Sequence, residues 1–80
     1  MRYWHVTTKN DDFITTTEDG ELTLQEVIAL SPEYCDKPYL DPDDENFDDD
    51  ELYEVECEVD IMEIDEEEHY NLFEQGVDER

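Results

Sequence analysis

The sequence predicts a small α+β domain, in which an antiparallel sheet of about three strands packs against one or two short helices. Runs of β-branched and aromatic residues, and one long stretch with an apolar–polar period of two, predict the strands. Capping signatures that begin at Thr23 and Asp65 predict the helices. The chain has 80 residues, so we expect one domain over residues 1–80 with a small buried core.

The first two strands are predicted near the N-terminus. Arg2–Thr8 alternates so that Trp4 and Val6 share one face. Polar turn residues follow, and Phe13–Thr17 then supplies the second strand of an antiparallel hairpin. Pairing of Phe13–Thr17 with Glu21–Leu24 is a second possibility. It is less favoured, because a helix signal begins within that later segment.

This helix signal predicts a helix over residues 24–30. Thr23 and Glu26 have the spacing of a capping box, and Leu22 and Val27 occupy the two positions of a hydrophobic staple. The Ser-Pro pair that follows ends the helix. A helix this short is unstable alone in water, so we expect it to pack on the sheet.

The segment that follows the helix is expected to be irregular. Residues 33–40 form a connection anchored by Tyr34 and Tyr39, and residues 41–50 form an acidic loop.

A long acidic strand is predicted next, over residues 51–64. Apolar and acidic residues alternate strictly in its centre, which is typical of a strand with one buried face. The inward residues would be Tyr53, Val55, Cys57, Val59 and Ile61. The outward residues would form a regular row of carboxylates, namely Glu54, Glu56, Glu58 and Asp60.

The C-terminal segment is predicted to be a helix and a loose tail. Asp65 and Glu68 have capping spacing, so the helix would run over residues 66–75 and end at Gly76. Its buried residues would be Leu72, Phe73 and part of Tyr70. Residues 77–80 would be loose.

Charge is the dominant property of the composition. The chain has 28 acidic and 4 basic residues, a net charge of -24, and 17 of the acids lie in residues 41–68. Such a composition is also typical of a disordered acidic segment, but nine aromatic residues, the alternation and the caps favour a folded domain. We expect no signal peptide, no membrane segment, and two free thiols, Cys35 and Cys57, in a reducing cytoplasm.

Neither catalysis nor metal binding is indicated by the motifs. The carboxylates look uniformly solvated, whereas acid–base catalysis needs two carboxyl groups in different environments. We therefore expect no enzyme, no catalytic residue and no cofactor. An EF-hand loop beginning at Asp44 would place Asp49 where glycine is required. No two of the possible zinc ligands His5, Cys35, Cys57 and His69 have the sequence spacing of a known zinc site.

The stretch 59–64, followed by acids, resembles a SUMO-interacting motif, which adds as a strand to a partner's sheet. The chain as a whole resembles another class, the small acidic phage-encoded DNA-mimic inhibitors, which include anti-CRISPR and anti-restriction proteins. This second resemblance covers size, charge and the stretch 41–68. It implies a non-enzymatic inhibitor in the host-cell cytoplasm. The inhibitor would occupy the basic groove of a DNA-binding protein, such as a CRISPR effector or a restriction enzyme.

Carboxylates would replace phosphates in such an inhibitor, and exposed aromatic residues such as Tyr39 or Phe47 would replace bases. We expect no direct nucleic-acid binding and no membrane contact. The candidate partner-binding residues are Glu54, Glu56, Glu58, Asp60, Asp43, Asp44, Asp48, Asp49, Asp50, Glu66, Glu67 and Glu68. The alternative is an acidic adaptor or chaperone-like module that binds a basic protein such as a histone.

Overall fold

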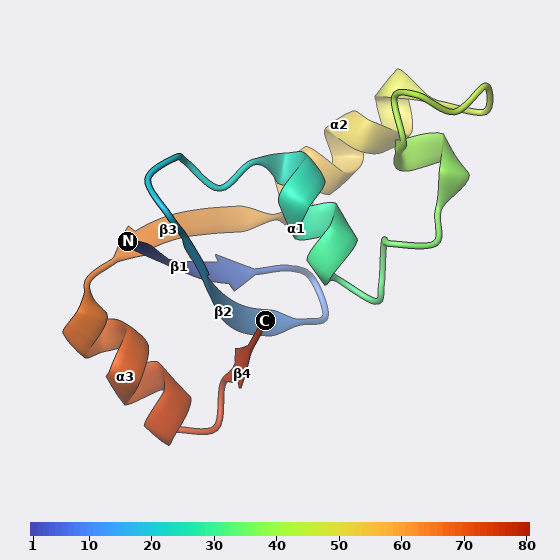
Figure 1. Cartoon of the computed structure of the whole chain (residues 1–80). Coiled ribbons are helices and arrows are strands. Elements are labelled where there is room, and N and C mark those ends of the chain that lie inside the picture. The colour runs from blue at the N-terminus through green and yellow to red at the C-terminus, as the bar shows by residue number, and fades with distance from the viewer.

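A four-stranded mixed sheet lies at the centre of the computed structural model, which describes residues 1–80 (Figure 1). The α+β class predicted from the sequence is therefore confirmed. The strands are β1 (Arg2–Thr7), β2 (Asp12–Thr17), β3 (Asp60–Ile64) and β4 (Asp78–Glu79), and their spatial order is β3-β1-β2-β4. The helices are α1 (Leu24–Leu30), α2 (Asp49–Glu58) and α3 (Glu66–Glu74), with a short 3₁₀ helix η1 (Pro38–Leu40).

The predicted N-terminal hairpin is confirmed. β1 and β2 pair antiparallel, with Arg2 opposite Thr17 and Thr7 opposite Asp12. The alternative pairing of β2 with residues 21–24 is wrong, because α1 already begins at Leu24. β3 pairs antiparallel with the other edge of β1, whereas β4 pairs parallel with β2 and makes the sheet mixed.

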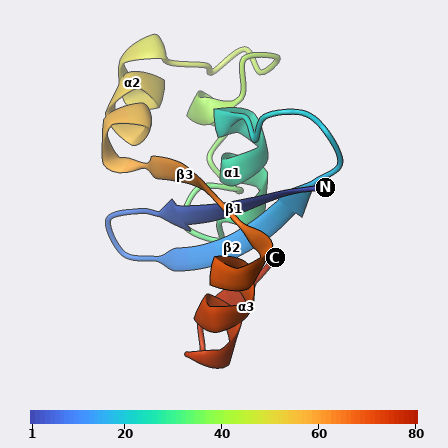
Figure 2. The same ribbon diagram turned by 90° about the vertical axis from the view of Figure 1, so that its left-hand side faces the viewer.

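The two faces of the sheet are covered by different helices. Figure 2 shows α1 on one side of the strands and α3 on the other. The α1 side holds the first core cluster, which consists of Trp4, Val6, Phe13, Leu22 and Val27. Trp4 and Val6 share this face as the alternation predicted. Thr23 caps α1 by accepting the Glu26 N–H at 3.2 Å, so the predicted N-cap is confirmed. The Glu26 carboxylate accepts from the Thr23 hydroxyl at 3.2 Å and not from the Thr23 backbone N–H, so the reciprocal bond of a capping box is not formed.

A second core cluster lies between α1, η1 and α2. It consists of Ile28, Tyr34, Leu40 and Val55. The Tyr34 hydroxyl donates to a Glu58 carboxylate oxygen at 3.3 Å and so ties the connection to α2. Burial, more than any other cause, raises the pKa of this hydroxyl. Tyr34 is thus an anchor as expected, and Tyr39 is half-buried.

The strand predicted over residues 51–64 is wrong for its first part. Residues 49–58 form helix α2, and only Asp60–Ile64 is a strand. Leu52, Val55 and the C-cap Val59 are spaced at i, i+3 and i+7. Val55 belongs to the second core cluster, and Leu52 and Val59 pack against it. Glutamate also favours helices and is depleted in strands.

The N-terminal end of α2 explains why residues 49–58 form a helix and not a strand. The Asp48 carboxylate accepts the backbone N–H groups of Asp50 and Glu51, at 2.9 and 3.5 Å. Three acids in the first turn stabilise the positive end of the helix dipole. As a result Tyr53 and Cys57, expected to point into the core, are exposed.

The C-terminal helix is confirmed, but the packing expected of it is not. Asp65 caps α3 by accepting the Glu68 N–H at 2.7 Å, and Gly76 ends it with a φ of 96°. Leu72 is half-buried, whereas Phe73 and Tyr70 are exposed. The expected burial of these two rings is wrong because α3 lies against the sheet by one narrow side only.

Residues 77–80 are ordered, contrary to the expected loose tail. Asp78 and Glu79 form β4 alongside β2. The Arg80 N–H donates to the Ile14 carbonyl at 2.8 Å, and its guanidinium donates to the Asp11 carboxylate at 2.7 Å. These contacts hold the end of the chain on the edge of the sheet.

Candidate functional site

Eleven of the twelve carboxylates predicted to bind a partner lie in two groups, one at each end of the molecule, and the twelfth, Asp60, lies between them on β3. One group is on α2 and the loop before it, and the other is on the first turn of α3 (Figure 1). The molecule measures 41 × 26 × 18 Å along its principal axes. β3 runs along the edge of the sheet and connects α2 directly to α3.

We call the twelve predicted carboxylates the acidic surface and describe them by element. Asp43, Asp44 and Asp48 precede α2, and five more acids lie on α2: Asp49, Asp50, Glu54, Glu56 and Glu58. Asp60 begins β3, and Glu66, Glu67 and Glu68 form the first turn of α3. Eleven of the twelve are exposed and Asp44 is half-buried. The predicted exposure therefore holds, although the predicted strand does not.

The regular row predicted for Glu54, Glu56, Glu58 and Asp60 is wrong. On a helix, residues two apart point in different directions, so Glu56 leaves the line of its neighbours. Asp50, Glu54 and Glu58 instead follow one another at i, i+4 and i+8. Their spacing along the axis is about 6 Å, from a rise of about 1.5 Å per residue. The helix thus builds a shorter row, which keeps Glu54 and Glu58 and adds Asp50.

None of the twelve carboxylates takes part in an ion pair. Arg2 donates to Glu63 at 2.8 Å, and this hydrogen bond lowers the pKa of Glu63. Arg80 pairs with Asp11 and Asp78, which lie elsewhere. The internal cations therefore leave the acidic surface uncompensated, and its charge is available to a partner.

Several of these carboxylates are held by local hydrogen bonds. Asp44 accepts the backbone and side-chain N–H groups of Asn46, at 2.9 and 3.2 Å. Asp48 caps α2 in the way described above. Each of these bonds goes to the Oδ1 atom of its carboxylate, so the chain itself holds both side chains in place. No group of three or more His, Cys, Asp or Glu residues is placed to hold a metal ion.

Exposed apolar side chains accompany the acids, and sequence reasoning did not find them. Tyr39 and Phe47, expected to be exposed, are half-buried. The exposed large residues of this region are Tyr53, Met62, Tyr70 and Phe73. The i, i+3 spacing of Tyr70 and Phe73 was a signal for a shared face of a helix, but it did not say which face of the helix the sheet would cover.

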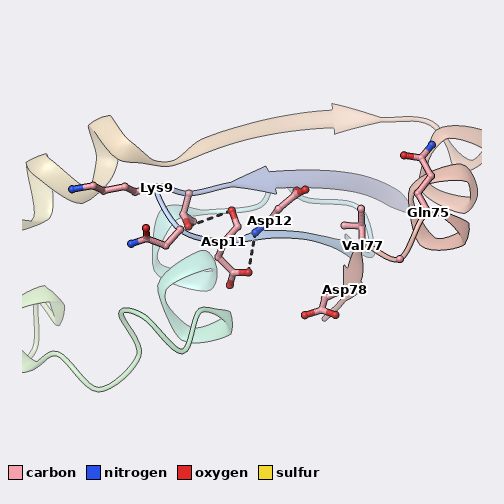
Figure 3. A pocket seen from close by; sticks show the side chains of 9 residues that line it. Lys9, Asp11, Asp12, Gln75, Val77 and Asp78 are labelled. Carbon is pink, nitrogen blue, oxygen red and sulfur yellow. Dashed lines mark hydrogen bonds between the residues drawn. The ribbon is translucent and has the colours of Figure 1, made fainter.

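A polar hollow of about 480 Å³ lies between the β1–β2 turn and the α3–β4 turn, as Figure 3 shows. Its walls include Lys9, Asp11, Asp12 and Gln75, and none of the acidic surface lines it. Within it, the Asp12 N–H donates to the Asp11 carboxylate at 2.9 Å. The Asp12 carboxylate also pairs with the His5 ring. Both carboxylates are therefore held by contacts within the hairpin of β1 and β2.

Comparison of the chain with models of protein families, with curated proteins and with solved structures gives no match. None of the helices combines the length and the apolar composition needed to cross a bilayer.

Proposed function

We propose that this protein is a DNA-mimic inhibitor, which occupies the basic nucleic-acid-binding groove of a host defence nuclease complex of the CRISPR or restriction type. The observation that carries the proposal is the acidic surface, twelve carboxylates of which eleven are exposed and none is paired with an internal cation. DNA-binding grooves present lysine and arginine to a dense row of phosphates. Uncompensated carboxylates on a folded protein offer the same groove an alternative anion.

The helices favour this function over that of a disordered polyanion. Most of the acidic surface lies on α2, on its N-terminal loop and on α3. A disordered acidic chain would have to lose conformational entropy on entering a groove, whereas carboxylates on helices are already ordered. The net charge of -24 would also accelerate association with a basic groove through long-range steering.

The dimensions of the molecule support the same proposal. Its longest axis of 41 Å is about twelve base pairs of B-form DNA, at roughly 3.4 Å per base pair. The two acidic groups lie at opposite ends of the molecule, so a groove that follows a duplex could contact both at once. β3 contributes the exposed Asp60 between them.

The test is competition with DNA for purified CRISPR effector complexes and restriction enzymes. One variant combines Asp50→Asn, Glu54→Gln, Glu56→Gln and Glu58→Gln, which lowers the charge of α2 and keeps its shape. We expect it to lose at least about a hundredfold in inhibition. Each close ion pair contributes roughly 1.5 kcal/mol or more, and 1.4 kcal/mol is a factor of ten. DNA displacement is measured by fluorescence anisotropy.

The matched control removes the same number of charges outside the acidic surface. It combines Glu18→Gln, Asp19→Asn, Glu21→Gln and Asp36→Asn, all exposed positions that make no side-chain hydrogen bond. Both variants have a net charge of -20, but we expect the control to keep most of its inhibition. Equal losses would contradict a positioned mimic. Binding to histones without displacement of DNA from any nuclease would favour the basic-protein adaptor instead.

A further inference from the structure

The outer face of α3 is aromatic as well as acidic. No residue of α3 is buried, and Tyr70 and Phe73 are 61% and 52% exposed. Residues three apart on a helix lie on the same face, so the two rings form one surface, which we call the aromatic face. Large aromatic side chains are enriched at the centres of protein interfaces, where they contribute much of the binding energy.

The adjoining side of α3, with His69 and Leu72, holds the helix against the sheet. The His69 ring lies 5.0 Å from the Tyr3 ring of β1, centroid to centroid, and its side chain is only 13% exposed. Leu72 is half-buried, and its carbonyl accepts the Val77 N–H at 3.1 Å. Rotation of α3 to cover Tyr70 and Phe73 would break the contact of His69 with Tyr3 and expose Leu72. The aromatic face therefore remains outward in the free protein.

Acidic side chains border the aromatic face at both ends. Glu66 and Glu67 precede Tyr70 by four and three residues, and Glu74 follows it by four. Tyr70 also lines a hollow of about 570 Å³ together with Asp65, Glu66 and Glu67. A lysine or arginine of a partner that enters this hollow would contact both the tyrosine ring and the carboxylates.

The charge decides what kind of surface can cover the aromatic face. A second copy of this chain would bring a further -24 against the same acids and would be repelled. A nucleic acid would be repelled for the same reason. A protein surface with an apolar centre and a lysine and arginine border satisfies both the rings and the carboxylates.

We propose that the aromatic face of α3, Tyr70 and Phe73, docks on an apolar patch of the partner protein that lies beside its basic groove. The acidic surface supplies the long-range attraction, and the two rings supply the contact that salt does not screen. This inference rests on the proposed function for the identity of the partner, and it adds an apolar contact to a binding mode otherwise made of charge.

The experiment uses two helical peptides of equal length and equal positive charge as probes. One has leucine along one face, and the other has serine at the same positions. Binding is measured by calorimetry in about 0.5 M salt, where the Debye length is roughly 4 Å and charge attraction is mostly screened. We expect the native protein to bind the leucine peptide at least about tenfold more tightly, as expected when aromatic hot spots are buried.

The double variant Tyr70→Ser/Phe73→Ser should lose this preference. The control Tyr53→Ser removes an exposed ring from α2 and should keep it. All three positions are exposed, so circular dichroism should show both variants folded. Equal binding of the two peptides by the native protein, or equal losses in double variant and control, would overturn the proposal. A native dimer that the double variant abolishes would assign the face to a second copy and would also overturn it.

The variant with four neutralised residues on α2 separates this proposal from the proposed function. It should lose DNA displacement and keep the preference for the leucine peptide. A native protein that prefers the leucine peptide but displaces DNA from no nuclease would refute the DNA-mimic function and leave the docking face established. Displacement of DNA by a native protein that binds both peptides equally would refute the docking face and support the DNA-mimic function.

Discussion

The two halves of this chain differ in what they contribute to the molecule. Residues 1–40 contain twelve of the thirteen buried residues, and residues 41–80 contain only Val55. Conversely, residues 41–80 contain 20 of the 28 acidic residues and a single basic residue, Arg80. The first half thus supplies nearly all of the core, and the second half supplies most of the negative charge. A net charge of -24 is compatible with folding here because the repelling groups lie outside the buried core.

The second half stays attached to the first through a few contacts of different kinds. Val55 enters the second core cluster, β3 pairs with β1, and β4 pairs with β2. Arg80 adds hydrogen bonds to Asp11 and to the Leu30 carbonyl. The carboxylates of α2 repel one another without an internal cation to offset them, so these attachments must supply the stability that the acids remove.

The largest expected effect comes from opening a cavity in the core of the first half, and a smaller cavity in the second half serves as the comparison. Phe13 is fully buried, and Phe13→Ala should cost about 3–5 kcal/mol, enough to unfold much of a domain this small. Val55→Ala removes two methyl-sized groups and should cost about 1.5 kcal/mol, at roughly 0.8 kcal/mol each. The measurement is urea unfolding followed by Trp4 fluorescence and by far-UV circular dichroism.

The two probes report on different halves, since Trp4 lies in the first core cluster and two of the three α-helices lie in the second half. Phe13→Ala should shift both transitions. Val55→Ala should shift the dichroism transition more than the fluorescence transition, because it loosens α2 while the sheet remains. Identical shifts of both probes in Val55→Ala would show that the halves unfold as one unit.

A smaller effect is expected from the contact of Arg80 with the hairpin formed by β1 and β2. The Arg80 guanidinium bonds Asp11 and Asp78 and lies 4.5 Å from the centre of the Phe13 ring. Arg80→Ala should cost about 1.5–3 kcal/mol, the usual range for hydrogen bonds to charged groups. The free energy of unfolding of both proteins, measured by urea titration across pH, tests this value.

The pH dependence of that difference has a definite sign. The hydrogen bond from Arg80 is the main reason why the pKa of Asp11 is lowered in the folded state. A lowered folded pKa contributes stability that is complete above the unfolded pKa of about 3.9 and is lost as pH falls through the folded value. The native protein should therefore keep its advantage over Arg80→Ala from pH 7 to 5, and that advantage should shrink below about pH 4. An advantage that grows on acidification would contradict the assignment.

The sequence predicted those parts of the fold that local chemistry determines. The N-terminal hairpin and α1 follow from alternation and from the Thr23 cap, and both are present. α3 follows from the Asp65 cap in the same way. β4 could not be predicted, because two residues become a strand only through parallel pairing with β2, far away in the chain.

The error at α2 has a physical cause that is visible in the sequence. Residues 52–61 alternate with a period of two, but Leu52, Val55 and Val59 also fit a helical stripe. Asp48 and Glu51 have the capping spacing that correctly predicted α3 from Asp65 and Glu68. The exposure of the acids was predictable from their charge. Their division between two ends of the molecule was not, because it depends on this helix.

The smallest expected effect concerns Asp48, which is part of the acidic surface and also stabilises α2. Asp48→Ala removes the acceptor for the N–H groups of Asp50 and Glu51, at a cost of about 1 kcal/mol. Asp48→Asn removes the same charge and keeps a good capping oxygen, so it is the matched control. Hydrogen exchange should show faster opening of the α2 amides in Asp48→Ala and little change in Asp48→Asn.

The amides of β1 and β2 should be unaffected in both variants, because the first half folds around its own core. Equal acceleration by alanine and asparagine would mean that the charge of Asp48 stabilises α2 through the helix dipole rather than through its hydrogen bonds. Acceleration throughout the sheet would mean that the charged half and the core half are not separable.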